Sequence, residues 1–198
     1  MKRRPLLLGL PLALAGCGLD VRPYAEQRQW PLQVPRPVAL PPRAGGKVLE
    51  VRDLRAGPGL DSVGLQAVRA DGSIETSFYE QWAVPPAQGV EDALRLWLAQ
   101  CGQFAAVVAP GTRAIPDLSL NGELTALWTD EAGHRARAAV AVTVVDVHSP
   151  ARGILLQQTF SATAPVTVTM PPAAVQAQLA ALADVFAQIE AAMVQKAA

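Results

Sequence analysis

Apolar residues recur with helical spacing after Pro85-Pro86. They lie at the i, i+3, i+4 and i+7 positions of one helical face, namely Val90, Ala93, Leu94, Trp97, Leu98 and Cys101. Glu91 and Asp92 stand near the expected start, where the positive end of the helix dipole favours acids, and Gly102 follows as a terminator. The spacing predicts an amphipathic helix here.

A second helix is predicted from Pro171-Pro172 to the end of the chain. Its apolar seam consists of Val175, Leu179, Leu182, Phe186, Ile189 and Met193. Its polar positions are Gln176, Gln178, Asp184, Gln188, Glu190, Gln195 and Lys196. A helix that lies on a membrane has a basic polar face, so this composition favours packing on a sheet, with a subunit contact as the alternative.

Strict alternation marks the clearest strand, from Leu118 to Thr129. Its even positions, Leu118 to Trp128, are apolar or small, and most of its odd positions are polar, so one face is expected to be buried and the other solvated. Further strands are expected at 48–54, 64–69, 74–79, 104–108, 135–147 and 154–163, with a hairpin turn at Asp71-Gly72. These elements predict an α+β fold with a mostly antiparallel sheet of about six to seven strands and two main helices on it.

The first sixteen residues have the pattern of an export signal. Lys2, Arg3 and Arg4 precede an uncharged stretch, and Pro5 to Gly16 is twelve residues long, whereas a membrane-spanning helix needs roughly 20. Leu14-Ala15-Gly16-Cys17 resembles the lipobox of bacterial lipoproteins, so we expect signal-peptidase recognition of these residues and cleavage before Cys17. Cys17 then carries an N-acyl chain, such as palmitate, and an S-diacylglycerol; no other cofactor is expected.

Three regions follow from this: a signal peptide at 1–16, a lipidated cysteine and extended tether at 17–46, and one periplasmic domain at 47–198. The segment from Gly18 to Gly46 holds six prolines in 29 residues and could reach up to roughly 90 Å at about 3.1 Å per residue. Because Tyr24, Trp30 and Leu32 are large and apolar, docking of part of it as an edge strand is an equal alternative.

Charge excludes one class of partner. Without the three signal-peptide cations, the 17 basic residues fall to 14 against 17 acidic ones, a net charge of −3. Nucleic acid binding depends on clustered positive charge, so no nucleic acid is expected. With Cys17 lipidated, Cys101 has no disulfide partner within the chain and is expected to be a buried apolar side chain.

No catalytic or metal-binding pattern emerges. His134 and His148 are the only histidines, and neither has a cysteine or a paired carboxylate at metal-ligand spacing. Ser62 is one place too late for a nucleophile elbow, and Gly57-Pro58-Gly59 lacks the lysine of a phosphate-binding loop. We expect a protein that is not an enzyme, with no metal site.

The order of two motifs is informative. Leu60-Asp61-Ser62-Val63-Gly64-Leu65 leads through a hairpin to Tyr79-Glu80-Gln81-Trp82-Ala83-Val84-Pro85-Pro86 and a helix. Over nearly the whole chain this resembles the ABC-type transport auxiliary lipoprotein family. Gln81 departs from the family, which commonly has arginine there. The resemblance marks Leu60, Asp61, Trp82, Pro85 and Pro86 as signature residues or an interface; capping of the helix and filling of the core is the alternative for Trp82 and the prolines.

The resemblance implies a lipoprotein partner of an MCE-type ABC system that moves lipids between inner and outer membranes. Its expected partners are an MCE-domain protein with its permease and ATPase, and the membrane through the anchor. Because some relatives form rings, a homo-oligomer is an alternative to a single copy. Gly18 rather than aspartate follows Cys17, which favours the outer membrane over the inner one. An assembly or scaffolding lipoprotein for lipopolysaccharide insertion or secretion is the alternative, and an envelope hydrolase is a third class.

Cys17→Ala should leave the protein without lipid and release it from the membrane, because stable anchoring needs more than one acyl chain and this cysteine would carry all of them. Metabolic labelling with a clickable palmitate and membrane fractionation measure both effects. Cys101→Ala is the matched control and should keep label and location. Label that persists in Cys17→Ala would contradict the assignment.

Overall fold

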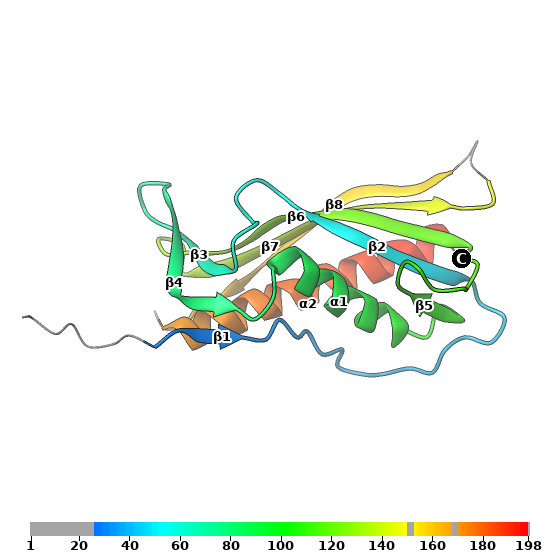
Figure 1. Cartoon of the computed structure of the whole chain (residues 1–198), viewed down its shortest axis with the longest axis horizontal. Helices are drawn as coiled ribbons and strands as arrows, with labels where there is room; N and C mark the ends of the chain where they lie inside the picture. Colours follow the sequence, from blue (N-terminus) through cyan, green and yellow to red (C-terminus); the bar gives the residue numbers. More distant parts are fainter. Residues whose placement is uncertain (1–25, 150–152, 168–169, 198) are drawn as a thin grey trace, which may run out of the picture.

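The structure, a computed structural model, describes residues 26–149, 153–167 and 170–197; the signal and lipidation residues 14–17 lie outside these ranges. Within them the chain forms one α+β unit with a mixed eight-stranded sheet and two helices (Figure 1). The elements are β1 (Arg28–Trp30), β2 (Val48–Ala56), β3 (Gly64–Val68), β4 (Ile74–Trp82), α1 (Pro86–Ala99), β5 (Ala106–Val108), β6 (Leu118–Asp130), β7 (Arg135–Asp146), β8 (Ile154–Pro165) and α2 (Pro171–Ala197).

Strand β6 is the centre of the sheet. One edge pairs antiparallel with β7 along the whole strand, and β7 pairs in turn with β8. The other edge is shared by two parallel strands, with β2 opposite Leu118 to Leu124 and β3 opposite Thr129 and Asp130. The chain turns away from β6 at Gly57, just after β2. The two backbones come so close there that a Cβ on residue 57 would lie 2.6 Å from the carbonyl oxygen of Leu124.

The expected mostly antiparallel sheet is therefore wrong in strand direction and in number. Four of the seven pairings are parallel, namely β1–β4, β2–β5, β2–β6 and β3–β6. Alternation of side chains predicts which face of a strand is buried, but it carries no information on the direction of the neighbour. The eighth strand, β1, comes from the proline-rich segment.

A β-bulge at Thr125 changes which side chains of β6 are buried. The register with β7 shifts between Leu124 and Ala126, so the side chains beyond the bulge exchange faces. Leu127 and Thr129 are consequently buried, while Trp128 is only half-buried. The expectation that even positions face the core is therefore wrong at Trp128, although it holds for Ala126, which is 2% exposed.

Both helices pack on one face of the sheet. Helix α1 lies against β2 and β5, and α2 against β8 and β7; in Figure 1, α1 lies in front of the fainter α2. Between them and the sheet lie Leu94, Leu98, Val140, Val185 and Phe186, all fully buried or nearly so. The predicted packing of the last helix on a sheet is confirmed.

Helix α2 is, among the described helices, the one whose length and composition would allow it to cross a membrane: its span Pro171–Lys196 has 26 residues and contains an 18-residue window with a mean hydropathy of 1.3. A core helix of a soluble domain has the same properties. Phe186 and Ile189 on α2 are fully buried in this fold, so the apolar character of the helix is accounted for by the core.

The start of α1 differs from the expectation. The helix begins at Pro86, a favoured residue at a first helical position, so Glu91 and Asp92 lie beyond the first turn. Glu91 instead accepts a hydrogen bond from the backbone N–H of Leu54 at 3.1 Å, which ties α1 to β2. Gly102 ends this region with a φ of +72°, as its position predicted.

Residues 31–43, called the strap below, run along α1 on the side away from the sheet. Leu32 and Val34 are buried there. The backbone N–H of Leu40 donates to the carbonyl of Gln100 at 2.8 Å. Gly89 of α1 permits the close approach, since a Cβ at that position would lie 3.0 Å from the Leu32 side chain. The strap therefore covers α1, which lies between it and the sheet.

One polar cluster joins the strap to both helices. Two nitrogens of the Arg36 guanidinium donate to the two carboxylate oxygens of Glu190, at 2.9 and 3.3 Å, and the indole N–H of Trp97 donates to the same carboxylate at 2.8 Å. The hydrogen bond to Glu190 raises the pKa of Arg36. Trp97 also meets Phe186 edge-on, with ring centroids 5.8 Å apart.

Glu190→Ala should lower the free energy of unfolding by about 2 kcal/mol, because Arg36 and Trp97 lose their acceptor in a mostly buried site. It should also free the strap, so that trypsin cuts faster after Arg43. Glu190→Gln keeps an acceptor oxygen and should lie between wild type and Glu190→Ala. Chemical denaturation and limited trypsin digestion measure this; unchanged strap cleavage in both variants would show that the cluster does not hold it.

Candidate functional site

The signature residues lie at a junction inside the fold. Leu60, in the loop before β3, is buried and Asp61 beside it is exposed. Trp82, the last residue of β4, is 2% exposed, and its backbone N–H donates to Val63 at 2.7 Å. Pro85 is exposed, whereas Pro86 opens α1 and is buried. These positions favour the structural alternative for Trp82 and Pro86, which fill the core and begin the helix.

The remaining candidates do not converge. Cys101 is fully buried, and this burial raises the pKa of its thiol. His148 lies 3.3 Å from Asp117 at the far end of β7, and His134 lies in the turn between β6 and β7 with a φ of +46°. Within the described ranges, no group of three or more histidine, cysteine or acidic residues could hold a metal ion.

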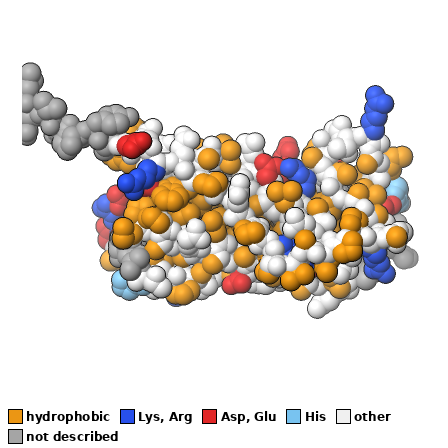
Figure 2. Space-filling view, turned by 90° about the horizontal axis from the view of Figure 1, so that it is seen from below, with side chains coloured by type: hydrophobic (Ala, Val, Ile, Leu, Met, Phe, Trp, Pro, Cys, Tyr) orange, Lys and Arg blue, Asp and Glu red, His pale blue; other side chains and the backbone are white. Residues whose placement is uncertain are grey.

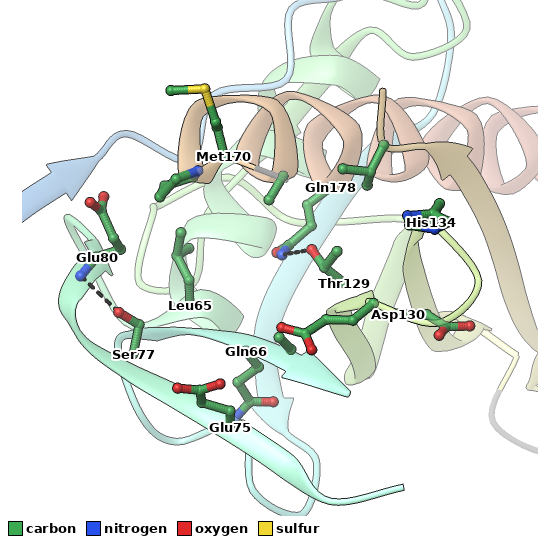
Figure 3. Close-up of a pocket in the computed structure, with 15 residues that line it drawn as sticks. Leu65, Gln66, Glu75, Ser77, Glu80, Thr129, Asp130, His134, Met170 and Gln178 are labelled. Atoms are coloured by element: carbon green, nitrogen blue, oxygen red, sulfur yellow. Dashed lines mark hydrogen bonds between the residues drawn. The ribbon is translucent and has the colours of Figure 1, made fainter. Parts of the chain in front are cut away.

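An open pocket of about 280 Å³ lies between the β3–β4 hairpin, the β6–β7 turn and the start of α2. Figure 3 shows side chains from these elements pointing toward one space. The lining residues are Leu65, Gln66, Ala67, Glu75, Ser77, Glu80, Thr129, Asp130, Glu131, His134, Val166, Met170, Pro171, Ala174 and Gln178. Its walls are largely apolar, with a few polar groups among them, which is the usual character of a small-molecule site.

Gln178 on α2 is the buried polar group of this pocket. Its side chain is 1% exposed. Its Nε2 donates to the hydroxyl oxygen of Thr129 on β6 at 3.0 Å (Figure 3), but its Oε1 has no hydrogen-bond partner. A buried carbonyl oxygen without a donor costs about 1–3 kcal/mol. The pocket therefore offers one acceptor that a bound group could satisfy.

Carboxylates supply all the formal charge of the lining. Glu75, Glu80, Asp130 and Glu131 line the pocket, and neither lysine nor arginine does. Arg69 pairs with Glu75 at 2.6 Å and Arg135 with Asp130 at 3.2 Å; the hydrogen bonds that Asp130 accepts, first from the Gly133 backbone, lower its pKa. Glu80 accepts from the Trp30 indole at 2.7 Å. These contacts hold the side chains of Glu75, Glu80 and Asp130 in place.

Large apolar side chains are exposed around the pocket. Phe78 and Tyr79, 67% and 48% exposed, stand on β4 between the lining residues Ser77 and Glu80, and Met170 of the lining is itself 59% exposed. Figure 2 shows apolar surface at the left end of the molecule. In Figure 1 this is also the end of β1, β4 and the start of α2. Such exposure is typical of a surface that contacts a partner or a lipid.

Sequence reasoning missed this site. Gln178 was assigned to the polar face of the last helix, and that assignment is wrong because its side chain is buried. Its spacing contained the signal: it follows Val175 by three residues and precedes Leu182 by four, so it shares their face. The other walls come from distant segments, which no local pattern joins.

Comparison with known proteins assigns the chain to a family. Residues 31–190 match the model of a family described as the ABC-type transport auxiliary lipoprotein component. No curated protein matches the sequence.

Solved structures share the fold. Protein XCC0632 of Xanthomonas campestris, of family DUF330, is 20% identical with a TM-score of 0.66, over 81% of this chain and 95% of its own. A second structure, of an uncharacterized protein, is 15% identical with a TM-score of 0.64, over 84% of this chain and 97% of its own. The hypothetical protein CT253 of Chlamydia trachomatis is 9% identical with a TM-score of 0.51, over 76% of this chain and 99% of its own.

Thr129→Val should lower the free energy of unfolding by about 1–3 kcal/mol, because the buried amide of Gln178 then has no partner at either end. Adding Gln178→Met removes the whole amide, so the double variant should return to within about 1 kcal/mol of wild type. Urea denaturation of the three proteins measures the difference. Equal destabilisation of the single and double variants would contradict the buried amide.

Proposed function

Because the chain belongs to the ABC-type transport auxiliary lipoprotein family, we propose that it is a lipid-anchored, non-enzymatic component of an MCE-type ABC system that moves lipids between the inner and outer membranes. The family match over residues 31–190 carries this proposal. In it, the chain works with an MCE-domain protein and its permease and ATPase.

The fold suits an accessory role that depends on surfaces. The exposed Phe78, Tyr79 and Met170 lie around one pocket at one end of the domain, and apolar exposure of this kind fits a partner or a membrane. The hydrogen bonds that Asp130 of the pocket accepts lower its pKa. A general acid needs a raised pKa, so Asp130 is not suited to that role.

Location follows from the anchor. Lipidation at Cys17 and a glycine at the next position lead us to propose the outer membrane, with the domain in the periplasm. The described chain begins at Glu26, nine residues after Cys17. At 3.3–3.6 Å per residue, this end of the domain then lies within roughly 30 Å of the lipid surface.

An affinity pull-down of the lipidated protein, extracted from membranes and analysed by mass spectrometry, tests the proposal. We expect an MCE-domain protein together with its permease or ATPase. Cys17→Ala, purified from the soluble fraction, is the control and should recover much less of the permease, because the unanchored protein is no longer held at the membrane. Recovery of only lipopolysaccharide-insertion or secretion factors would instead indicate an assembly lipoprotein.

A further inference from the structure

We propose that the pocket between the β3–β4 hairpin and α2 binds the head of a membrane amphiphile that donates hydrogen bonds and carries no net negative charge. The inference rests on the proposed function for the source of the ligand, since the anchor keeps the domain beside a membrane. The binding site itself follows from the geometry of the pocket.

The unpartnered acceptor sets the first requirement. Gln178 Oε1 lacks a donor although the side chain is 1% exposed, and the amide lines the pocket beside Thr129. A ligand that brings an O–H or N–H group to this oxygen satisfies a group that is otherwise buried at a cost. A head that only accepts hydrogen bonds leaves it unpaired.

Charge sets the second requirement. Four carboxylates line the pocket, and neither lysine nor arginine does. From outside the lining, Arg69 pairs with Glu75 and Arg135 with Asp130. Arg28 also lies 3.7 Å from Glu80. No lysine or arginine of the lining is therefore available to pair with an anionic head, which would meet the carboxylates as like charge at short range. Neutral hydroxyls and ammonium groups are compatible with both the carboxylates and the amide oxygen.

The size of the pocket and its surroundings set the third requirement. A volume of about 280 Å³ is at the lower end of ligand pockets, enough for a head group and the first part of a chain. Leu65, Val166 and Ala174 supply apolar walls, and Met170 and Phe78 extend apolar surface outside. An amphiphile places its head against Gln178 and its chain along these side chains.

The pocket opens at the end of the domain that lies near the membrane, where such a ligand is available. Strand β1, at the start of the described chain, pairs with the end of β4, and three residues of β4 line the pocket. Nine residues separate Glu26 from Cys17, so the pocket lies near the membrane end of the domain. A lipid that enters it needs to leave the bilayer by only a short distance.

Photo-crosslinking in vesicles tests the proposal. The full lipidated protein is reconstituted in phosphatidylcholine, whose head has no hydrogen-bond donor, with a monoacylglycerol that carries a diazirine near its head. We expect crosslinks on residues 170–178 and on β3 or β4, mapped by mass spectrometry. The same chain ending in a carboxylate should label the pocket at least about fivefold less, the loss expected for one hydrogen bond.

Matched variants locate the site. Ala174→Phe fills the pocket and should abolish the specific label, whereas Ala180→Phe, on the exposed side of the same helix, should leave it unchanged. Gln178→Met keeps the volume but removes the acceptor and should reduce label about fivefold. Thermal melting confirms that each variant is folded.

Equal labelling of wild type and Ala174→Phe, or equal labelling by the two head groups, would overturn the proposal. Neither the MCE protein nor the ATPase is present in the vesicles. The crosslinking result therefore does not depend on the result of the pull-down, which tests the association with the transporter.

Discussion

The fold depends on the pairing of β6 with three other strands. β7 occupies one edge along its whole length, and β2 and β3 divide the other edge between them. The bulge at Thr125 lies between the two halves and turns Thr129 toward the helices. Because Thr129 holds Gln178, the same strand that organises the sheet also forms the floor of the pocket.

Sequence patterns predicted the elements well where one local period decided them. The two helices and the Gly102 terminator depend on neighbours in the sequence, and the structure shows them. On β6, Leu118, Leu120 and Leu124 are buried as predicted, but Ser119, expected on the solvated face, is 5% exposed. The directions of the strands could not be predicted from these local patterns, because the parallel pairing of β6 with β2 and β3 is a long-range property. The prediction for Trp128 was also wrong, because the sequence of the strand contains no signal for the extra residue of the bulge.

The candidate site was less predictable than the fold. Trp82 and Pro86 were prominent in the sequence, but they lie in the core and at a helix start, where their constraint is packing. The pocket residues are individually ordinary, and only tertiary structure brings Gln178 beside Thr129, 49 positions away. The prediction placed Gln178 on the polar face, although its spacing from Val175 and Leu182 could have shown that it faces inward.

The strap and the pocket are connected through β1. Arg36, Glu190 and Trp97 fix the strap across α1, and β1 just before it pairs with β4, so the described chain begins at the pocket end. The central claim is that the protein acts only as part of a lipid-transport system. Genetic epistasis tests this directly, by comparing detergent sensitivity of strains that lack this gene, the ATPase of the system, or both. We expect equal sensitivity in all three strains; a double deletion that is clearly more sensitive than either single deletion would contradict the account.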